Sequence, residues 1–180
     1  MTVHRATLLL LLVSLVAMPT APLSATSYVM VSDAALADQA GLIVRAEVEE
    51  RWVSSASGKV MTHYRVAVEE VLKGDVPGSG LEIRVLGGVD LERNQALKIW
   101  GMPNFRAGES ALLFLRGNDD GSYHVLHMLL GAFHLRSGFA ARALDEDPVI
   151  PASTEEGRSS ARPQRHTERF TSWIEDRARG

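Results

Sequence analysis

Histidines are the first side chains to consider, because they bind metals and the chain has six of them but no cysteine. His124 and His127 are three residues apart, and His134 follows seven residues after His127. On a strand, the odd spacing of the first pair turns the two rings toward opposite faces of the sheet. No carboxylate stands where it could complete a ligand set, so we expect neither a metal site nor a cofactor. We interpret His127, which is in step with Val125 and Leu129, as a partly buried structural histidine.

Serine and glycine motifs give no pattern typical of catalysis. Ser79 lies between two glycines just after Pro77, whereas the nucleophile of an α/β-hydrolase needs Gly-x-Ser-x-Gly between a strand and a helix. The pair Gly87-Gly88 has no helix N-terminus after it to bind a phosphate, so we interpret it as a tight exit from a strand. The lack of cysteine excludes thiol catalysis and disulfides.

Two acidic pairs, Glu49-Glu50 and Glu69-Glu70, have the side chains needed for acid–base work. Basic residues surround them in the sequence, because Arg45, Arg51 and Arg65 lie on the same or neighbouring predicted strands. We therefore expect solvent-facing ion pairs across the strands. The sequence predicts no catalytic residue, and the alternative left open is an enzyme whose site is assembled from dispersed residues.

The side chains best suited to contact a partner lie in the segment Trp100-Gly101-Met102-Pro103-Asn104-Phe105. Large apolar side chains are usually buried, so one interpretation is that they plug one end of the fold. Trp, Phe and Met are also enriched in interface cores, which makes Trp100, Met102, Pro103 and Phe105 candidate binding residues.

Elements of secondary structure must position these side chains, and the hydrophobic pattern of the sequence around them predicts mostly β-strands. Residues 32–41 are typical of a short helix capped by Ser32 or Asp33. From Leu42 the hydrophobic period changes to two, which predicts a half-buried strand with only Ile43 out of step.

Further strands follow, separated by turns rich in Gly, Pro, Asn and Asp. We expect them at 63–69, 81–85, 111–115, 122–130, 131–135 and 139–144, with a short strand at 96–100 inside the long connection 87–107. The run 111–115 is apolar on both faces, which is typical of a central strand. Short antiparallel strands with one small helix over residues 26–144 favour a small closed or partly closed barrel, with a sandwich as the alternative.

Several short motifs together resemble a group of bacterial exported domains. They are residues 42–48 (LIVRAEV) after a short helix, residues 64–74 (YRVAVEEVLKG), Gly87-Gly88, Pro103-Asn104-Phe105, and Gly108-Glu109 ahead of an apolar strand. These domains are similar to the netrin-like, OB-type barrel of tissue inhibitors of metalloproteinases, and the resemblance covers about residues 29–135 and 167–177. It implies a small antiparallel OB-type (netrin-like) barrel. Some domains of the group precede a matrixin-like zinc protease domain, joined by a segment that resembles residues 168–174 (ERFTSWI), which implies a metalloprotease as the partner.

The chain also departs from these relatives. The animal inhibitors chelate the protease zinc through an N-terminal cysteine, and this sequence has none. The motif His-Glu-x-x-His of the zinc protease domain is absent as well. The sequence ends at Gly180, directly after the joining segment, which fits either a stand-alone version of the domain or a truncated N-terminal part of such a protease.

The N-terminus predicts export. Arg5 precedes the apolar run 8–17, Pro19 breaks the run, and Ala25 supplies a small residue for cleavage. A membrane-spanning helix needs about 20 apolar residues, so this run is too short. We expect residues 1–25 to be a signal peptide and the mature chain to be periplasmic or extracellular.

Composition limits the partners. The chain is 46% hydrophobic and 23% charged, which is typical of a globular protein. It has 22 acidic and 19 basic residues, a net charge of −3, whereas an OB-type barrel that binds single-stranded nucleic acid needs a positive groove with aromatic side chains. We therefore expect no nucleic-acid partner, and no membrane contact after signal cleavage.

The C-terminal part predicts a linker and a helix. Residues 145–166 are rich in Pro, Ser, Glu and Arg and predict a disordered linker. Residues 167–179 predict a helix with Phe170, Trp173 and Ile174 on one apolar stripe. An isolated helix of this length is marginal in water, so we expect the stripe to dock, first of all on the chain's own barrel, and we count its three residues as candidate binding residues.

The sequence thus predicts an exported, non-catalytic protein-binding module. The resemblance implies that it is an accessory, pro-region or inhibitor-like domain for a matrixin-type metalloprotease.

Overall fold

The computed structural model describes residues 28–56, 58–143, 149–150 and 164–180, so the predicted signal peptide lies outside the described residues. The first elements are β1 (Tyr28–Val29) and helix α2 (Asp33–Gln39). The hydroxyl of Ser32, one of the two caps that the sequence allows, caps α2 by accepting a hydrogen bond from the Ala35 N–H at 3.1 Å.

The rest of the described chain is mostly β. Two long strands, β2 (Leu42–Ala56) and β3 (Lys59–Lys73), form an antiparallel pair and are followed by β4 (Gly80–Leu86). The remaining elements are β5 (Gly88–Asp90), β6 (Gln95–Leu97), β7 (Ser110–Gly117), β8 (Tyr123–Val125), the 3-10 helix η1 (Met128–Gly131), β9 (Ala132–Arg136), β10 (Phe139–Ala141), β11 (Val149–Ile150), β12 (Gln164–His166) and helix α4 (Thr167–Arg179).

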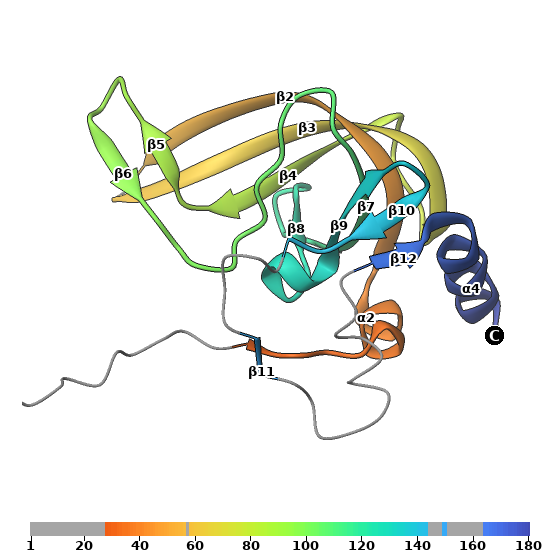
Figure 1. Cartoon of the computed structure of the whole chain (residues 1–180). Coiled ribbons are helices and arrows are strands. Elements are labelled where there is room, and N and C mark those ends of the chain that lie inside the picture. Colours follow the sequence, from red (N-terminus) through yellow and green to blue (C-terminus); the bar gives the residue numbers. More distant parts are fainter. Residues whose placement is uncertain (1–27, 57, 144–148, 151–163) are drawn as a thin grey trace, which may run out of the picture.

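The main sheet curls back on itself. Its strand order is β12-β10-β9-β7-β2-β3-β4-β8, and β8 also pairs with β7, so β7, β2, β3, β4 and β8 form a ring. The closing strand β8 is only three residues long and meets β4 through the single parallel pair Ile83 and Tyr123, so the ring is closed unevenly. Figure 1 shows the strongly curved sheet, with the β5–β6 hairpin beyond one end of the β2–β3 pair and α4 at the other. The prediction of a mostly β, barrel-like fold with a short helix at each end is confirmed.

Two apolar cores lie on opposite faces of strands β2 and β7. The first core lies inside the ring and includes Val44 and Leu113. The second core lies outside it, and Ile43 and Phe114 point into it from the same two strands. Ile43 is completely buried there, which explains why it is out of step with the alternation of its strand. The run 111–115 is buried on both faces, as predicted.

Helix α4 docks on its own barrel. Phe170 and Ile174 are buried in the second core, and Phe170 packs against Phe133 with ring centroids 5.0 Å apart. Trp173 lies at the edge of this contact, 37% exposed and stacked on Phe170. At the end of the helix, Arg177 pairs with Asp38 of the α2 helix. Within the described part of the chain, no helix is long and apolar enough to cross a membrane.

The structure corrects the predicted strand 122–130. Strand β8 ends at Val125, and η1 follows it because His127 and Met128 adopt left-handed backbone conformations with φ of 49° and 59°. His127 is exposed rather than partly buried, and its Nε2 lies 2.7 Å from the Gln39 side chain. Alternation alone could not reveal a chain reversal whose left-handed residues are neither Gly nor Asn.

Two other predicted segments differ in detail. The strand predicted at 139–144 is β10, which ends at Ala141. Within the predicted linker 145–166 the structure describes two short strands, β11 and β12, which pair with β1 and β10. The other residues of that linker lie outside the described part of the chain.

Candidate functional site

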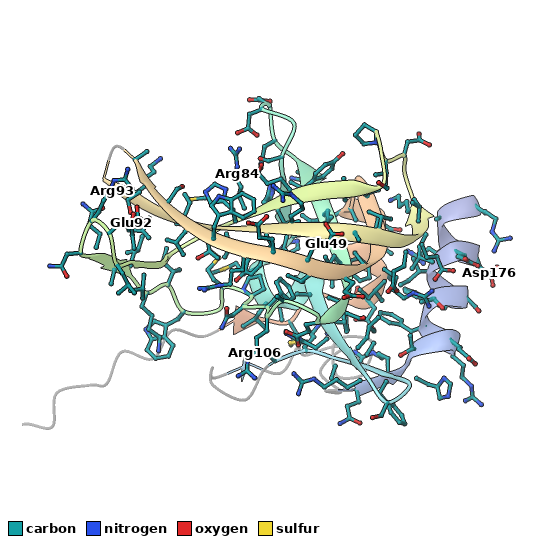
Figure 2. All side chains as sticks on the ribbon, turned by 90° about the horizontal axis from the view of Figure 1, so that it is seen from above. Glu49, Arg84, Glu92, Arg93, Arg106 and Asp176 are labelled. Atoms are coloured by element: carbon teal, nitrogen blue, oxygen red, sulfur yellow. The ribbon has the colours of Figure 1, made fainter. Side chains whose placement is uncertain are left out.

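A pocket of about 590 Å³ lies between the ring of strands and the β5–β6 hairpin. One wall comes from β3 and β4, and the opposite wall comes from the hairpin and the segment 98–104. Residues at the start of β9 and in η1 close one side. Figure 2 shows the hairpin extending away from the barrel, with Glu92 and Arg93 at its far tip and Asp176 of α4 at the opposite end of the molecule.

The glycine pair after β4 sets the shape of the pocket. Gly87 and Gly88 have φ of 107° and 143°, which side chains rarely adopt. A Cβ on Gly88 would lie 2.6 Å from the hydroxyl oxygen of Thr62, and one on Gly87 would lie 2.9 Å from the Leu97 carbonyl oxygen. The Thr62 hydroxyl in turn donates to the carbonyl of Gly87 at 2.7 Å. This is the tight strand exit that the sequence predicts, and it turns the chain into the hairpin.

Tyr64 anchors the segment that carries the predicted binding residues. Its hydroxyl donates to the Asn104 side-chain oxygen at 3.2 Å and accepts from the Phe105 N–H at 3.4 Å. The rings of Tyr64 and Phe105 meet edge to face at 5.3 Å. Phe105 is 1% exposed and belongs to the first core. The expectation that large side chains of this segment plug one end of the fold therefore holds for Phe105.

The other predicted residues of this segment line the pocket. Trp100 is 49% exposed, Met102 is half-buried and Pro103 is buried. The Nζ of Lys98 lies 3.7 Å from the centroid of the Trp100 ring, so a cation covers one face of this indole. The structure thus brings Trp100, Met102 and Pro103 together at one pocket and separates Phe105 from them.

The ionisable side chains that line the pocket include Arg51, Lys98 and His134. Arg51 and Lys98 are exposed at it, and His134 lines it from β9. No Asp or Glu is among the described residues that line it. A ligand with an apolar group and a negative charge would therefore find complementary surroundings.

Glu109 fixes the strand that backs the pocket. Its carboxylate accepts from the Arg106 N–H at 3.0 Å, lies 2.7 Å from His134 Nδ1 and accepts from Arg136 at 3.2 Å. Burial acts to raise the pKa of Glu109, but the hydrogen bonds from Arg106, His134 and Arg136 outweigh it, so the pKa lies below its ordinary value. The carboxylate therefore orients His134 and ties the start of β7 to β9.

The predicted binding residues of α4 form no common surface with the pocket. Phe170 and Ile174 are buried in the second core, so they are not available to a partner. Trp173 is the exposed member of the stripe. Figure 1 places α4 at the end of the sheet away from the β5–β6 hairpin. The seven candidate residues therefore divide into a pocket group, a buried Phe105 and a helix group.

A buried ion cluster joins the N- and C-terminal parts of the fold, and no local sequence pattern indicates it. The guanidinium of Arg142 donates to Asp33 at 2.8 Å and to the Leu130 carbonyl at 2.8 Å. Arg165 of β12 donates to the other carboxylate oxygen of Asp33 at 2.9 Å. Burial lowers the pKa of Arg142 to about 10, which leaves it charged at neutral pH. The cluster links α2 and β12 to the segment that directly follows β10.

The three histidines considered for a metal each have a different hydrogen-bond partner. His124 is hydrogen-bonded to Asn118, His127 to Gln39 and His134 to Glu109. The acidic pairs also behave in part as predicted: Arg45 pairs with Glu69 and Glu70 at 3.1 and 3.4 Å, and Arg65 pairs with Glu50 at 2.5 Å.

No protein-family model matches the chain, and no curated protein sequence matches it significantly.

Proposed function

We propose that the chain is an exported protein-binding module whose pocket, formed by β3, β4, the β5–β6 hairpin and the segment 98–104, holds a segment of a partner protein. The observation that carries this proposal is the combination at one pocket of a half-exposed tryptophan, Trp100, an adaptable methionine, Met102, and basic side chains, with no acidic side chain among the described residues that line it. Tryptophan and arginine are the residues that most often dominate binding energy in interfaces, and methionine adapts to varied ligand shapes.

The fold type belongs to the same proposal. We assign the ring of five strands to the OB type, which is a five-stranded, partly open barrel that binds ligands on its second and third strands. In the order of the chain, β3 and β4 are the second and third strands of the ring, and both line the pocket. The position of the pocket therefore supports a binding role of the kind OB-type barrels have.

The resemblance to netrin-like domains indicates the class of partner. It points to a matrixin-type metalloprotease, for which this chain would be an accessory, pro-region or inhibitor-like domain. The charges of the pocket add a condition on the bound segment, because Arg51 and Lys98 favour a carboxylate next to an apolar side chain.

The proposal is tested with the purified mature chain and a purified matrixin-type protease domain from the same organism. Calorimetric titration should show binding, and Trp100→Ala should weaken it at least about tenfold, as for a central aromatic anchor. Leu91→Ala is the matched control, because Leu91 is an apolar residue of the neighbouring β5–β6 hairpin, 85% exposed, that does not line the pocket. Equal affinities of the two variants, or no binding of the wild-type chain, would contradict the proposal.

A further inference from the structure

A hydrogen-bonded chain of three polar side chains crosses the outer face of β2, β3 and β4, and the proposed binding function does not use it. Ser54 Oγ lies 2.6 Å from His63 Nε2, and His63 Nδ1 lies 2.9 Å from Glu82 Oε1. A hydroxyl on one imidazole nitrogen and a carboxylate on the other is the arrangement of nucleophile, base and orienting group in serine hydrolases. Ser54 is half-buried, and His63 is 9% exposed.

The strand register brings these residues together. His63 lies opposite Trp52 on β2 and opposite Arg84 on β4, so Ser54 and Glu82 are its diagonal neighbours on the same face. The flanking residues of β3, Thr62 and Tyr64, point to the pocket side instead. Because each member comes from a different strand, no sequence motif could reveal the cluster.

The protonation of the cluster follows from its charges. Hydrogen bonds from Arg84 first, and then from His63, hold the pKa of Glu82 below its ordinary value, so its carboxylate is ionised at neutral pH and can only accept. His63 must therefore donate from Nδ1. In the neutral ring Nε2 then carries the lone pair and accepts the proton of the Ser54 hydroxyl. The stacking of Trp52 on His63, at 5.1 Å and 9°, holds the ring in this plane.

Other charges around the imidazole are already balanced. On β4, Arg84 bonds Glu82 at 2.7 Å and pairs with Asp120. On β3, Arg65 pairs with Glu50 of β2 and lies over the Trp52 ring at 5.5 Å. Glu82 is therefore the carboxylate that contacts the ring directly, and it favours the imidazolium that forms when Ser54 loses its proton.

We propose that Ser54 is a nucleophile activated by His63, with Glu82 as a positioning residue, and that this face of the barrel hydrolyses carboxylic esters. Ser54 Oγ forms a bond to the ester carbonyl carbon while its proton passes to His63 Nε2. The ester C–O bond breaks, and the leaving alcohol takes that proton. Water then attacks the acyl group with His63 as base, which releases the carboxylic acid and returns the proton to Ser54. This activity goes beyond the binding function proposed above and does not depend on it.

The test uses a fluorophosphonate probe, which forms a covalent adduct with activated serines, and p-nitrophenyl acetate as the ester. Peptide mass analysis of the full mature chain should place the adduct on Ser54 and not on Ser172, an exposed serine of α4. Ser54→Ala should abolish labelling and ester turnover. His63→Gln should slow labelling about 100-fold or more, as expected for loss of a general base. Ser172→Ala should change neither rate.

The labelling rate of a folded Glu82 variant separates a role in catalysis from a purely structural role. Glu82→Gln keeps the size of the side chain but removes its charge, and it should slow the labelling of Ser54 in a folded chain, because the anion that favours the imidazolium is gone. Thermal unfolding establishes which variants are folded. The proposal is overturned by the lack of an adduct on Ser54, by equal labelling of Ser172, or by an undiminished labelling rate in folded His63→Gln or folded Glu82→Gln.

Discussion

The guanidinium of Arg142, whose side chain is fully buried, donates to the carboxylate of Asp33 at 2.8 Å although the two residues are 109 positions apart. Arg165 of β12 shares the same carboxylate. One acidic residue at the start of α2 thus holds the end of the barrel and the strand that leads into α4.

Asp33→Ala should therefore destabilise the fold strongly. The change removes a carboxylate that the buried guanidinium of Arg142 and the side chain of Arg165 both contact, and we expect the free energy of unfolding to fall by about 3 kcal/mol. Asp38→Ala is the control, because Asp38 pairs with Arg177 at the surface and should contribute less than about 1 kcal/mol. Urea unfolding of the two variants gives both values, and similar losses would contradict the role assigned to Asp33.

The docking of α4 predicts an order of effects along its apolar stripe. Ile174 is completely buried, so Ile174→Ala should lower the free energy of unfolding by about 3 kcal/mol. Trp173 keeps 37% of its surface exposed, so Trp173→Ala should cost nearer 1 kcal/mol, from the loss of its stacking on Phe170. The measurement is denaturant unfolding, with a variant ending at Leu144 as reference. If all of these unfold at the same midpoint as the wild-type chain, α4 does not dock on its own barrel.

The turn after β4 predicts that alanine at two glycine positions will have very different effects on stability. Gly88→Ala would place a Cβ 2.6 Å from the Thr62 hydroxyl in a backbone conformation with φ of 143°, and should destabilise the chain by about 2 kcal/mol. A Cβ on Gly78 would lie in open space, so Gly78→Ala should change stability by less than about 0.5 kcal/mol. Thermal unfolding compares them, and equal melting temperatures would argue against the tight exit.

The lowered pKa of Glu109 predicts a pH dependence. A carboxyl group whose pKa is lower in the folded chain stabilises it above the pKa of the unfolded chain, near 4.5, and loses that effect as the pH falls through the folded value. The difference in unfolding free energy between the wild-type chain and Glu109→Gln should therefore shrink as the pH falls below about 4.5. A constant difference for Glu109→Gln in urea titrations at several pH values would contradict the assigned hydrogen bonds.

The sequence predicted much of the fold because local patterns carry it. The alternation from Leu42 marks β2, the two-sided run 111–115 marks β7, and the stripe of α4 marks its buried face. Ile43 was out of step because a second core, built partly by a helix more than 120 residues away, lies on that face. The strand predicted to continue past Val125 was wrong, because left-handed residues outside Gly and Asn leave no compositional mark.

The candidate sites also differ in how far the sequence could predict them. Trp100, Met102 and Pro103 lie close together in the sequence, so their shared place at the pocket could be anticipated from residue type. The relation of Asp33 to Arg142 depends on how remote segments fold together, which no local pattern encodes. The chain of Ser54, His63 and Glu82 depends on the register of three strands, and a shift of one residue in either pairing would turn its members to opposite faces.

The central claim is that the pocket at Trp100 contacts a partner protein, and site-specific photo-crosslinking in the native host tests it most directly. A photoreactive amino acid at position 100 should give a crosslinked species whose mass analysis identifies a protein with a His-Glu-x-x-His protease domain, with the attachment on an extended segment of it. The same amino acid at position 91, exposed on the neighbouring β5–β6 hairpin outside the pocket, should give little of this product. Equal crosslinking at the two positions, or no crosslinked partner with such a domain at position 100, would contradict the account.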